Sequence, residues 1–470
     1  MRLKKNFAVK NQIFRLSFCV VIYAVNAIVV GTPISITATL PQFIVLLFGI
    51  YRISGKYFDV QDMYWISSFL FFVIAPLQSL KGLGASDIAF FEWGPTERYT
   101  FLASEVYTAS LIVTTFFLST ILLMRYFSWL NLSRALDFVA ESQELRGSSS
   151  KLTVFFSLFI FSCVAYIIMS GGIGNVLASR YEKEREDIVK GAVVCLAFLT
   201  VSAYFFISVY LRSSQSIKLK KSPLIVVVLV LLAVFNNPFN TPRFFLIACW
   251  LPVFLMFING RLSFKLAYLS VIFSVMFILP ILSLTTRHGL DGLGDVQYSE
   301  LVNNFFITPY ADVFDTLVYL IRYTNIHGFN FGYNSLGIIT FFIPRSVWPG
   351  KPEVVATSQI GEDLVYFAGA GTSNLSMFFA GELYMDFNLI GVIVGGLFMA
   401  ALIVVMRKDH EDGRGLRSLL SYILIASLPI LLRGPLMAVL ALFVFQMFSF
   451  FVLLKFTRGI NVFLRAPGAN

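Results

Sequence analysis

Long runs of hydrophobic residues, separated by short polar segments, dominate this chain. Runs of about 17 to 21 apolar residues are long enough for an α-helix to cross the hydrocarbon core of a bilayer. On this criterion we predict about twelve membrane spans, at residues 14–31, 34–51, 63–80, 104–124, 152–170, 191–211, 223–239, 241–259, 266–286, 387–406, 416–432 and 435–454. The pattern therefore predicts an all-α, polytopic membrane protein.

The predicted spans divide the chain into three parts: residues 1–286, a bundle of about nine helices; residues 287–386, a long outer segment; and residues 387–470, the last helices and a tail. A segment as long as the second usually has structure or function of its own. In this segment the helical spacing from Phe314 to Ile321 predicts an amphipathic helix that lies on the membrane. Short apolar pieces broken by Gly and Pro, such as "FFIPRSVWPGKP", predict re-entrant elements that line a cavity.

Composition supports the same class of protein. Hydrophobic residues make up 57% of the chain and charged residues only 13%, which excludes a soluble domain of this length. The four cysteines all lie in apolar runs, so neither disulfides nor a zinc site is expected; they are Cys19, Cys163, Cys195 and Cys249.

The net charge of +10 reflects membrane topology rather than nucleic-acid binding. Two thirds of the 36 Lys and Arg residues fall in the segments that lie on one side if the N-terminus is inside. Because cytoplasmic loops of membrane proteins are enriched in Lys and Arg, we predict that both termini are cytoplasmic.

Several basic residues on the predicted outer side depart from this rule. A single arginine there is explained by snorkelling, in which the alkyl stem follows the lipid and the guanidinium reaches the headgroups. Here several basic residues share one predicted depth and lie on turns that contain proline. This arrangement predicts a site for a polyanionic lipid headgroup such as pyrophosphate, because guanidinium binds phosphate through paired hydrogen bonds. These residues are Arg243, Arg287, Arg345, Lys351 and Arg433.

The outer segment also holds candidates for a general base. Glu382 ranks first, because "FFAGELY" places an acid in apolar surroundings that raise the pKa of a carboxyl; the alternative is a structural pair with an arginine. Asp312 and Asp315 are spaced to share a metal, although one capping and one solvated aspartate is the commoner arrangement. The other candidates are His327, His288, Glu362, Asp363 and Asp386.

Aromatic residues of the outer segment suit either of two roles. Their rings can stack on sugars, and they can equally anchor the protein at the membrane interface. The candidates are Tyr310, Tyr333, Trp348, Tyr366 and Tyr384. No nucleotide-binding motif is present, so neither ATP hydrolysis nor a cofactor or metal is expected.

The order of motifs in residues 235–440 resembles the Wzy-type polymerases of bacterial O-antigen and capsule oligosaccharide repeat units. The motifs that carry this resemblance are "NPFNTPR", "FFIPRSVWPGKP", "GTSN", "FAGELYMDFNLIG" and "LLRGP". The first half of the chain matches that family only in hydropathy.

The resemblance implies a glycosyltransferase of the inner membrane with a GT-C-like fold and a periplasmic active site. Its substrate would be an oligosaccharide linked to undecaprenyl pyrophosphate, and its partners a chain-length regulator and a flippase of the same pathway, with no nucleic acid. Arg243, Arg345 and Arg433 would bind the pyrophosphate, supported by Arg287 and Lys351, and Tyr333, Trp348 and Tyr384 would contact sugar.

Two other functions fit the same residues. An O-antigen ligase uses the same donor on the same face and differs in transferring the glycan to lipid A core. A flippase for the lipid-linked repeat would also have about twelve spans, but charged or broken helices near the midplane would then be expected.

Overall fold

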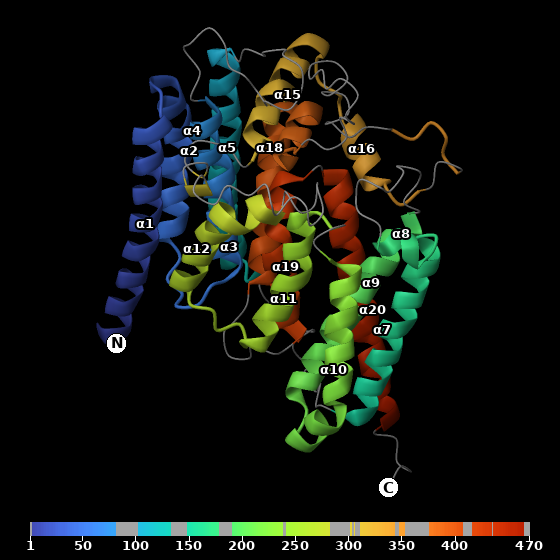
Figure 1. The fold of residues 1–470 in the computed structure, drawn as a ribbon. Helices are drawn as coiled ribbons and strands as arrows, with labels where there is room; N and C mark the ends of the chain where they lie inside the picture. The colour runs from blue at the N-terminus through green and yellow to red at the C-terminus, as the bar shows by residue number, and fades with distance from the viewer. Residues whose placement is uncertain are drawn as a thin grey trace.

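The hydrophobic runs form helices in the computed structural model (Figure 1). The structure describes residues 2–80, 102–132, 148–177, 190–237, 241–282, 301–302, 305, 311–343, 347–352, 376–407, 416–434 and 436–464. In these ranges ten helices are long and apolar enough to cross a membrane, which is the architecture of a multi-pass membrane protein.

Each of the twelve predicted runs is mainly helical over the residues that the structure describes. The first half of the chain forms α1 (Arg2–Val30), α2 (Pro33–Tyr51), α3 (Val60–Phe69), the π-helix η1 (Leu70–Ile74), α4 (Ala75–Ser79), α5 (Ala103–Trp129), α7 (Ser149–Met169), α8 (Ile173–Leu177) and α9 (Lys190–Arg212). The second half forms α10 (Gln215–Phe235), α11 (Arg243–Phe257), α12 (Phe264–Phe273), the π-helix η4 (Ser274–Ile278), α15 (Val313–His327), α16 (Tyr333–Ile339), α18 (Phe379–Met406), α19 (Leu416–Arg433) and α20 (Leu436–Leu464).

Two of the twelve runs are not among the ten candidate spans. The helix α10 carries Lys218, Lys220 and Lys221 near its start, and α11 has only 15 residues. An α-helix of 15 residues is about 23 Å long, which is shorter than the hydrocarbon core of a bilayer.

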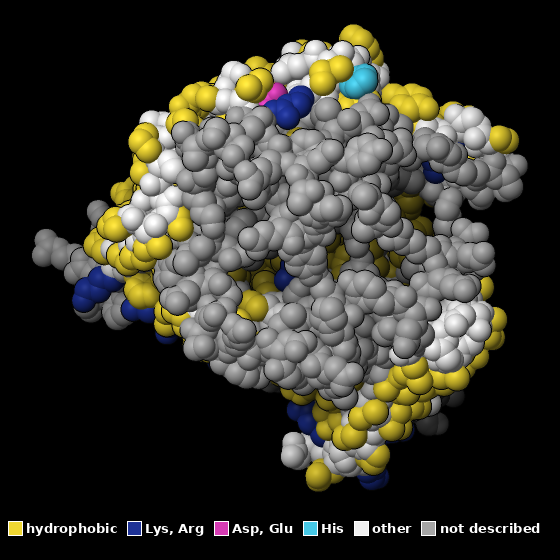
Figure 2. All heavy atoms as spheres, turned by 45° about the horizontal axis from the view of Figure 1, so that its top comes forward, with side chains coloured by type: hydrophobic (Ala, Val, Ile, Leu, Met, Phe, Trp, Pro, Cys, Tyr) yellow, Lys and Arg dark blue, Asp and Glu magenta, His cyan; other side chains and the backbone are white. Residues whose placement is uncertain are grey.

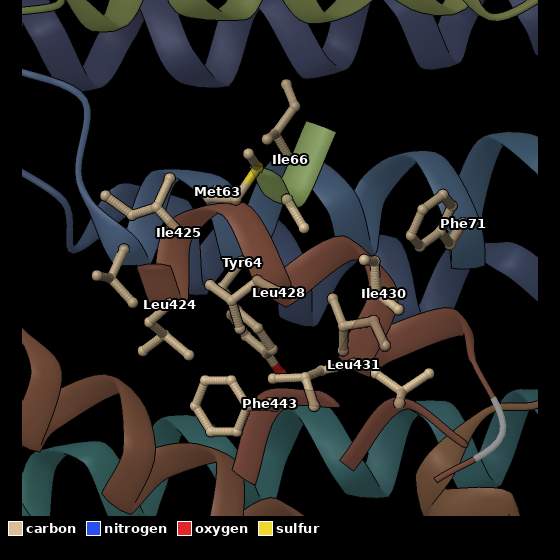
Figure 3. Packing of buried hydrophobic residues seen from close by; sticks show 14 of the residues in the cluster. Met63, Tyr64, Ile66, Phe71, Leu424, Ile425, Leu428, Ile430, Leu431 and Phe443 are labelled. Atoms are coloured by element: carbon tan, nitrogen blue, oxygen red, sulfur yellow. The ribbon is translucent and has the colours of Figure 1, made fainter. Parts of the chain in front are cut away.

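The most buried helices lie at the centre of the bundle. Every residue of the continuous helix from Val60 to Ser79 is buried, as is most of α19, which packs against it. Figure 3 shows this interface, where Tyr64 lies near Leu428. Lipid tails are as apolar as these side chains, so close packing, rather than exclusion from water, holds such helices together inside a membrane.

Both ends of the chain lie at one end of the bundle. In Figure 1 the start of α1 and the end of α20 are at the bottom, whereas α15 and α16 are at the top. The helices α15 and α16, which belong to the long segment predicted to be on the outer side, therefore lie opposite the two termini.

The helix α18 is a hairpin of two helical segments. Its backbone leaves the helical conformation at Phe387 and at Asn388, which has φ +55° and ψ −149°. The segment 379–386 then lies back along the following turns, because a Cβ on Gly395 would be 3.3 Å from the Phe379 ring and 3.4 Å from Ala380. This is the geometry expected of a re-entrant element, although it occurs after "FFIPRSVWPGKP" rather than within it.

The start of this hairpin lies near the middle of the bundle. The ring of Phe378 is 4.5 Å from that of Phe72 and 5.0 Å from that of Phe116, measured between centroids. Phe72 lies about 18 Å along a helix of about 30 Å that begins at Val60, and Phe116 is midway along α5. The segment 379–386 therefore rises from the interior of the bundle toward its outer end.

The helix predicted around Phe314 to Ile321 is confirmed as α15, but the prediction that it lies on the membrane surface is wrong. Every residue from Val313 to Ile321 is buried, and α15 packs against α5, α18 and α4. Its charged side chains are accommodated by partners in these neighbours: Ser79 donates to Asp315 at 2.7 Å, and Arg322 donates to Glu105 at 2.7 and 2.9 Å.

Candidate functional site

Two of the predicted arginines converge on one aromatic ring. Arg243 begins α11 and Arg433 ends α19, and their guanidinium carbons lie 5.9 and 4.7 Å from the centroid of the Phe244 ring. The two guanidinium groups are therefore no farther apart than the sum of these distances. Phe244 is itself held by Phe71 of η1 in an edge-to-face contact of 6.1 Å.

Asp312 completes this group. Its carboxylate accepts a hydrogen bond from Arg433 at 3.1 Å and another from the backbone N–H of Ser376 at 3.3 Å. The next N–H, of Met377, donates to the carbonyl of Arg433 at 2.7 Å. Burial alone would raise the pKa of Asp312, but the charge of Arg433 and the hydrogen bonds outweigh it, so the pKa lies below the usual value. Asp312 is therefore ionised and neutralises part of the positive charge.

The arginine pair keeps donors that a ligand can use. A guanidinium has five N–H donors, and within the described ranges the buried Nε of Arg433 has no hydrogen-bond partner. The side chain of Arg433 is 19% exposed. Arg243 donates a long hydrogen bond of 3.4 Å to the carbonyl of Leu279 in the turn after η4. Such a long contact to a neutral carbonyl is readily exchanged for a charged phosphate oxygen.

The pair lies below the outer end of the bundle. Arg433 is the last residue of a candidate span, and Arg243 is the first residue of the apolar helix α11. Phe71 lies a little more than halfway along Val60–Ser79, so the guanidinium groups lie against apolar helices rather than in an external loop. Figure 2, which brings the outer end forward, shows hydrophobic and basic side chains in a hollow near its centre. A charged residue at membrane depth is retained at high free-energy cost, and it usually marks a functional site.

Asp315 occupies a different environment from Asp312. It is 1% exposed and accepts the hydroxyl of Ser79 at 2.7 Å. Burial, and to a smaller extent the nearby charge of Asp312, raise the pKa of Asp315 well above its usual value. The expectation of one capping and one solvated aspartate is therefore wrong, because Asp312 pairs with Arg433 and Asp315 is buried.

Glu382 and Asp386 lie one turn apart on the segment 379–386. Glu382 is 2% exposed, which fits the apolar environment predicted for it. Asp386 is 1% exposed and accepts from the backbone N–H of Asn334 at 3.2 Å and of Ser335 at 2.6 Å, and from the Ser335 hydroxyl. Asp386 therefore caps the start of α16.

The other described candidates lie on α15, on α16, on the segment 379–386 and in the segment 347–352. His327, exposed at the end of α15, lies 4.5 Å from the ring of Tyr323, and Tyr384 is buried against Phe329. Tyr333 is 48% exposed. Trp348 and Lys351 share a turn in which the buried Lys351 ammonium donates to the carbonyl of Ile343 at 3.2 Å.

Several predicted residues lie outside the described ranges: Arg287, His288, Tyr310, Arg345, Glu362, Asp363 and Tyr366. Among the residues that are described, no three His, Cys, Asp or Glu side chains gather as a metal site would require. Cys19, Cys163 and Cys249 are buried free thiols, as expected, whereas Cys195 is half-buried.

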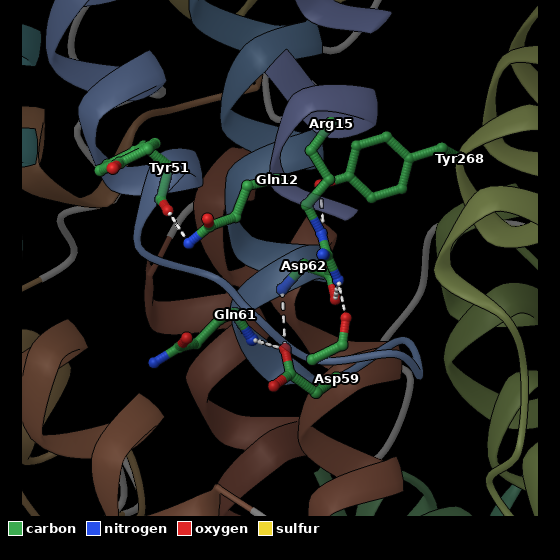
Figure 4. Close-up of polar contacts among 8 residues, drawn as sticks. Gln12, Arg15, Tyr51, Asp59, Gln61, Asp62 and Tyr268 are labelled. Atoms are coloured by element: carbon green, nitrogen blue, oxygen red, sulfur yellow. Dashed lines mark hydrogen bonds and ion pairs between the residues drawn. The ribbon is translucent and has the colours of Figure 1, made fainter. Parts of the chain in front are cut away.

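The sequence analysis missed a buried ion pair at the opposite end of the bundle (Figure 4). Arg15 donates to Asp62 at 2.7 and 3.0 Å, Tyr268 donates to the same carboxylate at 3.1 Å, and both partners of the pair are fully buried. In the sequence, Arg15 is one of the Lys and Arg residues on the predicted cytoplasmic side. The signal that could have found the pair is Asp62, an acid near the start of a predicted span.

Comparison of this chain with protein-family models, with curated proteins and with solved structures found no match.

Proposed function

We propose that this protein is a polysaccharide polymerase of the bacterial inner membrane. It would transfer a growing glycan from undecaprenyl pyrophosphate to the non-reducing end of a lipid-linked oligosaccharide repeat unit. The observation that carries the proposal is the arginine pair at the Phe244 ring, with Asp312 beside Arg433. Paired guanidinium groups at the ends of apolar helices suit the pyrophosphate of a lipid carrier, whose head must lie near the bilayer surface.

In this proposal the arginines act on the leaving group. The bond between the anomeric carbon and the pyrophosphate oxygen breaks, and negative charge develops on the departing polyprenyl pyrophosphate. Arg243 and Arg433 stabilise this charge from positions fixed before the reaction. Cleavage of this bond between sugar and pyrophosphate supplies the free energy for the transfer, so no nucleotide is needed.

The acceptor hydroxyl must lose its proton as it attacks the anomeric carbon. Asp312 is poorly suited to take this proton, because its low pKa and its pairing with Arg433 make it a weak base. Glu382, at the hairpin, and Asp315, whose pKa is raised, are the better candidates. The rings of Tyr333, Trp348 and Tyr384 would stack on sugar rings. His327 is a further candidate base.

The proposed topology has twelve spans, with α10 and α11 crossing together with the ten long helices, and both termini in the cytoplasm. The reaction then takes place at the periplasmic face. A flippase would deliver the lipid-linked repeat, and a chain-length regulator would act on the same enzyme.

The experiment is a glycan ladder from cells that lack this protein, complemented with wild type, Arg243→Ala, Arg433→Ala or Glu382→Ala, with membrane levels checked by blot. We expect single repeats instead of ladders in the null strain and in the three variants. Arg52→Ala, at the opposite end of the bundle, is the matched control and should restore full ladders.

Other outcomes would replace this function with another. Full-length chains that remain on undecaprenyl pyrophosphate and do not reach lipid A core would indicate an O-antigen ligase. Loss of even single repeats from the periplasmic face would indicate a flippase. Full ladders in a well-expressed Arg433→Ala strain would remove the arginine pair from the mechanism.

A further inference from the structure

A second polar feature, separate from the arginine pair, lies where α16 meets the α18 hairpin. The side chain of Asn334 is 1% exposed. Within the described part of the chain, neither its amide nitrogen nor its amide oxygen has a hydrogen-bond partner. The large majority of buried polar side-chain atoms in folded proteins have at least one partner, so an amide with neither group paired calls for an explanation.

The backbone around Asn334 is firmly held. Its N–H and that of Ser335 both donate to the carboxylate of Asp386, at 3.2 and 2.6 Å. Just before the helix, the N–H of Asn330 donates to the carbonyl of Met385 at 2.9 Å. These contacts fix α16 on the tip of the hairpin, so the unpaired amide is not the result of a loosely placed helix.

The position of the amide relates it to the proposed chemistry. Asp386 lies one helical turn after Glu382, so both carboxylates are on one face of the segment 379–386. Tyr384, on the same segment, packs its ring 5.6 Å from that of Phe329, edge to face. The residue that carries the carboxamide thus contacts the carboxylate of Asp386 at the hairpin, with Glu382 one turn away. A carboxamide both donates and accepts hydrogen bonds, as adjacent hydroxyl groups of a sugar do.

We propose that Asn334 binds the acceptor sugar, with its amide paired to hydroxyl groups of the lipid-linked repeat unit. This inference rests on the proposed function and assigns the acceptor to the hairpin and the pyrophosphate to the arginine pair. The unpaired amide is then a polar group kept ready for a ligand, at the expense of stability in the free protein.

Sugar reaches the amide when α16 moves away from the hairpin. The connection between α15 and α16 has three residues with positive φ, namely Gly328 at 82°, Phe331 at 48° and Gly332 at 92°. Positive φ at Phe331, a residue with a bulky side chain, is uncommon and strained. The opposite face of α16 is apolar and open, with Ile339 68% exposed and Leu336 43% exposed. Movement of α16 at this connection would break its hydrogen bonds to Asp386, but few contacts on its outer face.

The test compares Asn334→Leu and Asn334→Ala with wild type in purified, detergent-solubilised full-length protein. The probe is the water-soluble repeat-unit oligosaccharide, released from its lipid carrier by mild acid. We expect Asn334→Leu to melt at the same temperature as wild type or higher, because leucine has the same number and branching of side-chain heavy atoms without an unpaired amide. We expect its affinity for the oligosaccharide to fall about tenfold or more.

Asn334→Ala provides a second test of binding in case Asn334→Leu does not fold. Bound oligosaccharide should raise the melting temperature of wild type, through binding to the native state, but not that of Asn334→Ala. Thr340→Ala, at the end of the same helix, is the matched control and should bind as wild type does. Unchanged oligosaccharide affinity in Asn334→Leu, or no binding by wild type, would overturn the inference. A melting temperature of Asn334→Leu below that of wild type would also overturn it, because the amide would then have a structural partner such as buried water.

Failure of this inference can be told from failure of the proposed function. Arg433→Ala should still bind the free oligosaccharide, which has no pyrophosphate, while losing polymer in cells. Normal ladders in that strain would count against polymerisation through the arginine pair, whatever Asn334 binds.

Discussion

Arg433 and Asp312 are 121 positions apart in the sequence and form an ion pair with an N–O distance of 3.1 Å. The pair joins the end of α19 to the residue just before α15, and the backbone of Ser376 and Met377 is bonded to both partners. The arginine is therefore oriented by three separate parts of the chain. Such prior orientation is what makes a charged donor effective at a reaction centre.

Arg433→Ala should lower the rate of polymer formation by a factor of about one hundred or more, or about 3 kcal/mol at the transition state, as for other fixed donors to developing negative charge. The rate is to be measured in membranes, as lipid-linked repeat consumed per unit of protein. Arg433→Lys should restore only part of it, because an ammonium cannot form the paired contact.

Asp312→Ala should lower the same rate less than Arg433→Ala does, because it removes the orientation and leaves the charge. In the double variant the two effects should not add, with a coupling energy above about 0.5 kcal/mol. Additive effects would mean that Asp312 does not act through Arg433.

Asp315 should make the protein less stable as pH rises. Its folded pKa is raised by burial, so its contribution to stability is fully present below the unfolded pKa of about 3.9 and is lost as pH rises through the folded pKa. Asp315→Asn keeps an acceptor for Ser79 and cannot ionise. We therefore expect its melting temperature to fall less than that of wild type between acid and alkaline pH.

Asp312→Asn provides the control of opposite sign. The folded pKa of Asp312 is lowered by Arg433 against the effect of burial, so its contribution is present above the unfolded pKa and lost as pH falls through the folded pKa. In Asp312→Asn the melting temperature should therefore depend less on pH than in wild type, and only at acid pH. Parallel curves for wild type and Asp315→Asn would contradict the prediction for Asp315.

Gly391→Ala should disrupt the hairpin. A Cβ at this position would collide with the backbone carbonyl of Leu383, which cannot move independently of its helix. We expect a lower melting temperature together with loss of polymer. Gly174→Ala, where a Cβ meets nothing within 4 Å, should leave both unchanged; equal behaviour of the two variants would show that the hairpin is not tightly packed.

Asp62→Ala should be among the most destabilising single substitutions in the bundle. It would leave the fully buried Arg15 without its carboxylate, and breaking a buried ion pair costs about 3–5 kcal/mol. Replacement of both residues, as Arg15→Met with Asp62→Leu, should recover much of this loss. The measurement is thermal unfolding in detergent. A double variant that melts no higher than Asp62→Ala would show that the loss does not come from the unpaired charge of Arg15 alone.

The amino-acid sequence by itself determined the class of fold. Every predicted apolar run is helical, because a backbone in lipid must satisfy its own hydrogen bonds and a helix does so within each run. It also predicts a side for the unusual arginines, since Arg243 and Arg433 depart from the distribution of Lys and Arg over the remaining loops.

Only the tertiary structure decided which of these residues meet. The spacing from Phe314 to Ile321 predicts α15 but not its burial. Burial is possible because Asp315 and Arg322 form hydrogen bonds with Ser79 and Glu105, which are far away in the sequence. The pairing of Asp312 with Arg433, the buried pair of Arg15 and Asp62, and the unpaired amide of Asn334 depend in the same way on contacts between distant segments. Local propensity sets where each helix begins and ends, whereas the partner of a buried polar group depends on how the helices pack.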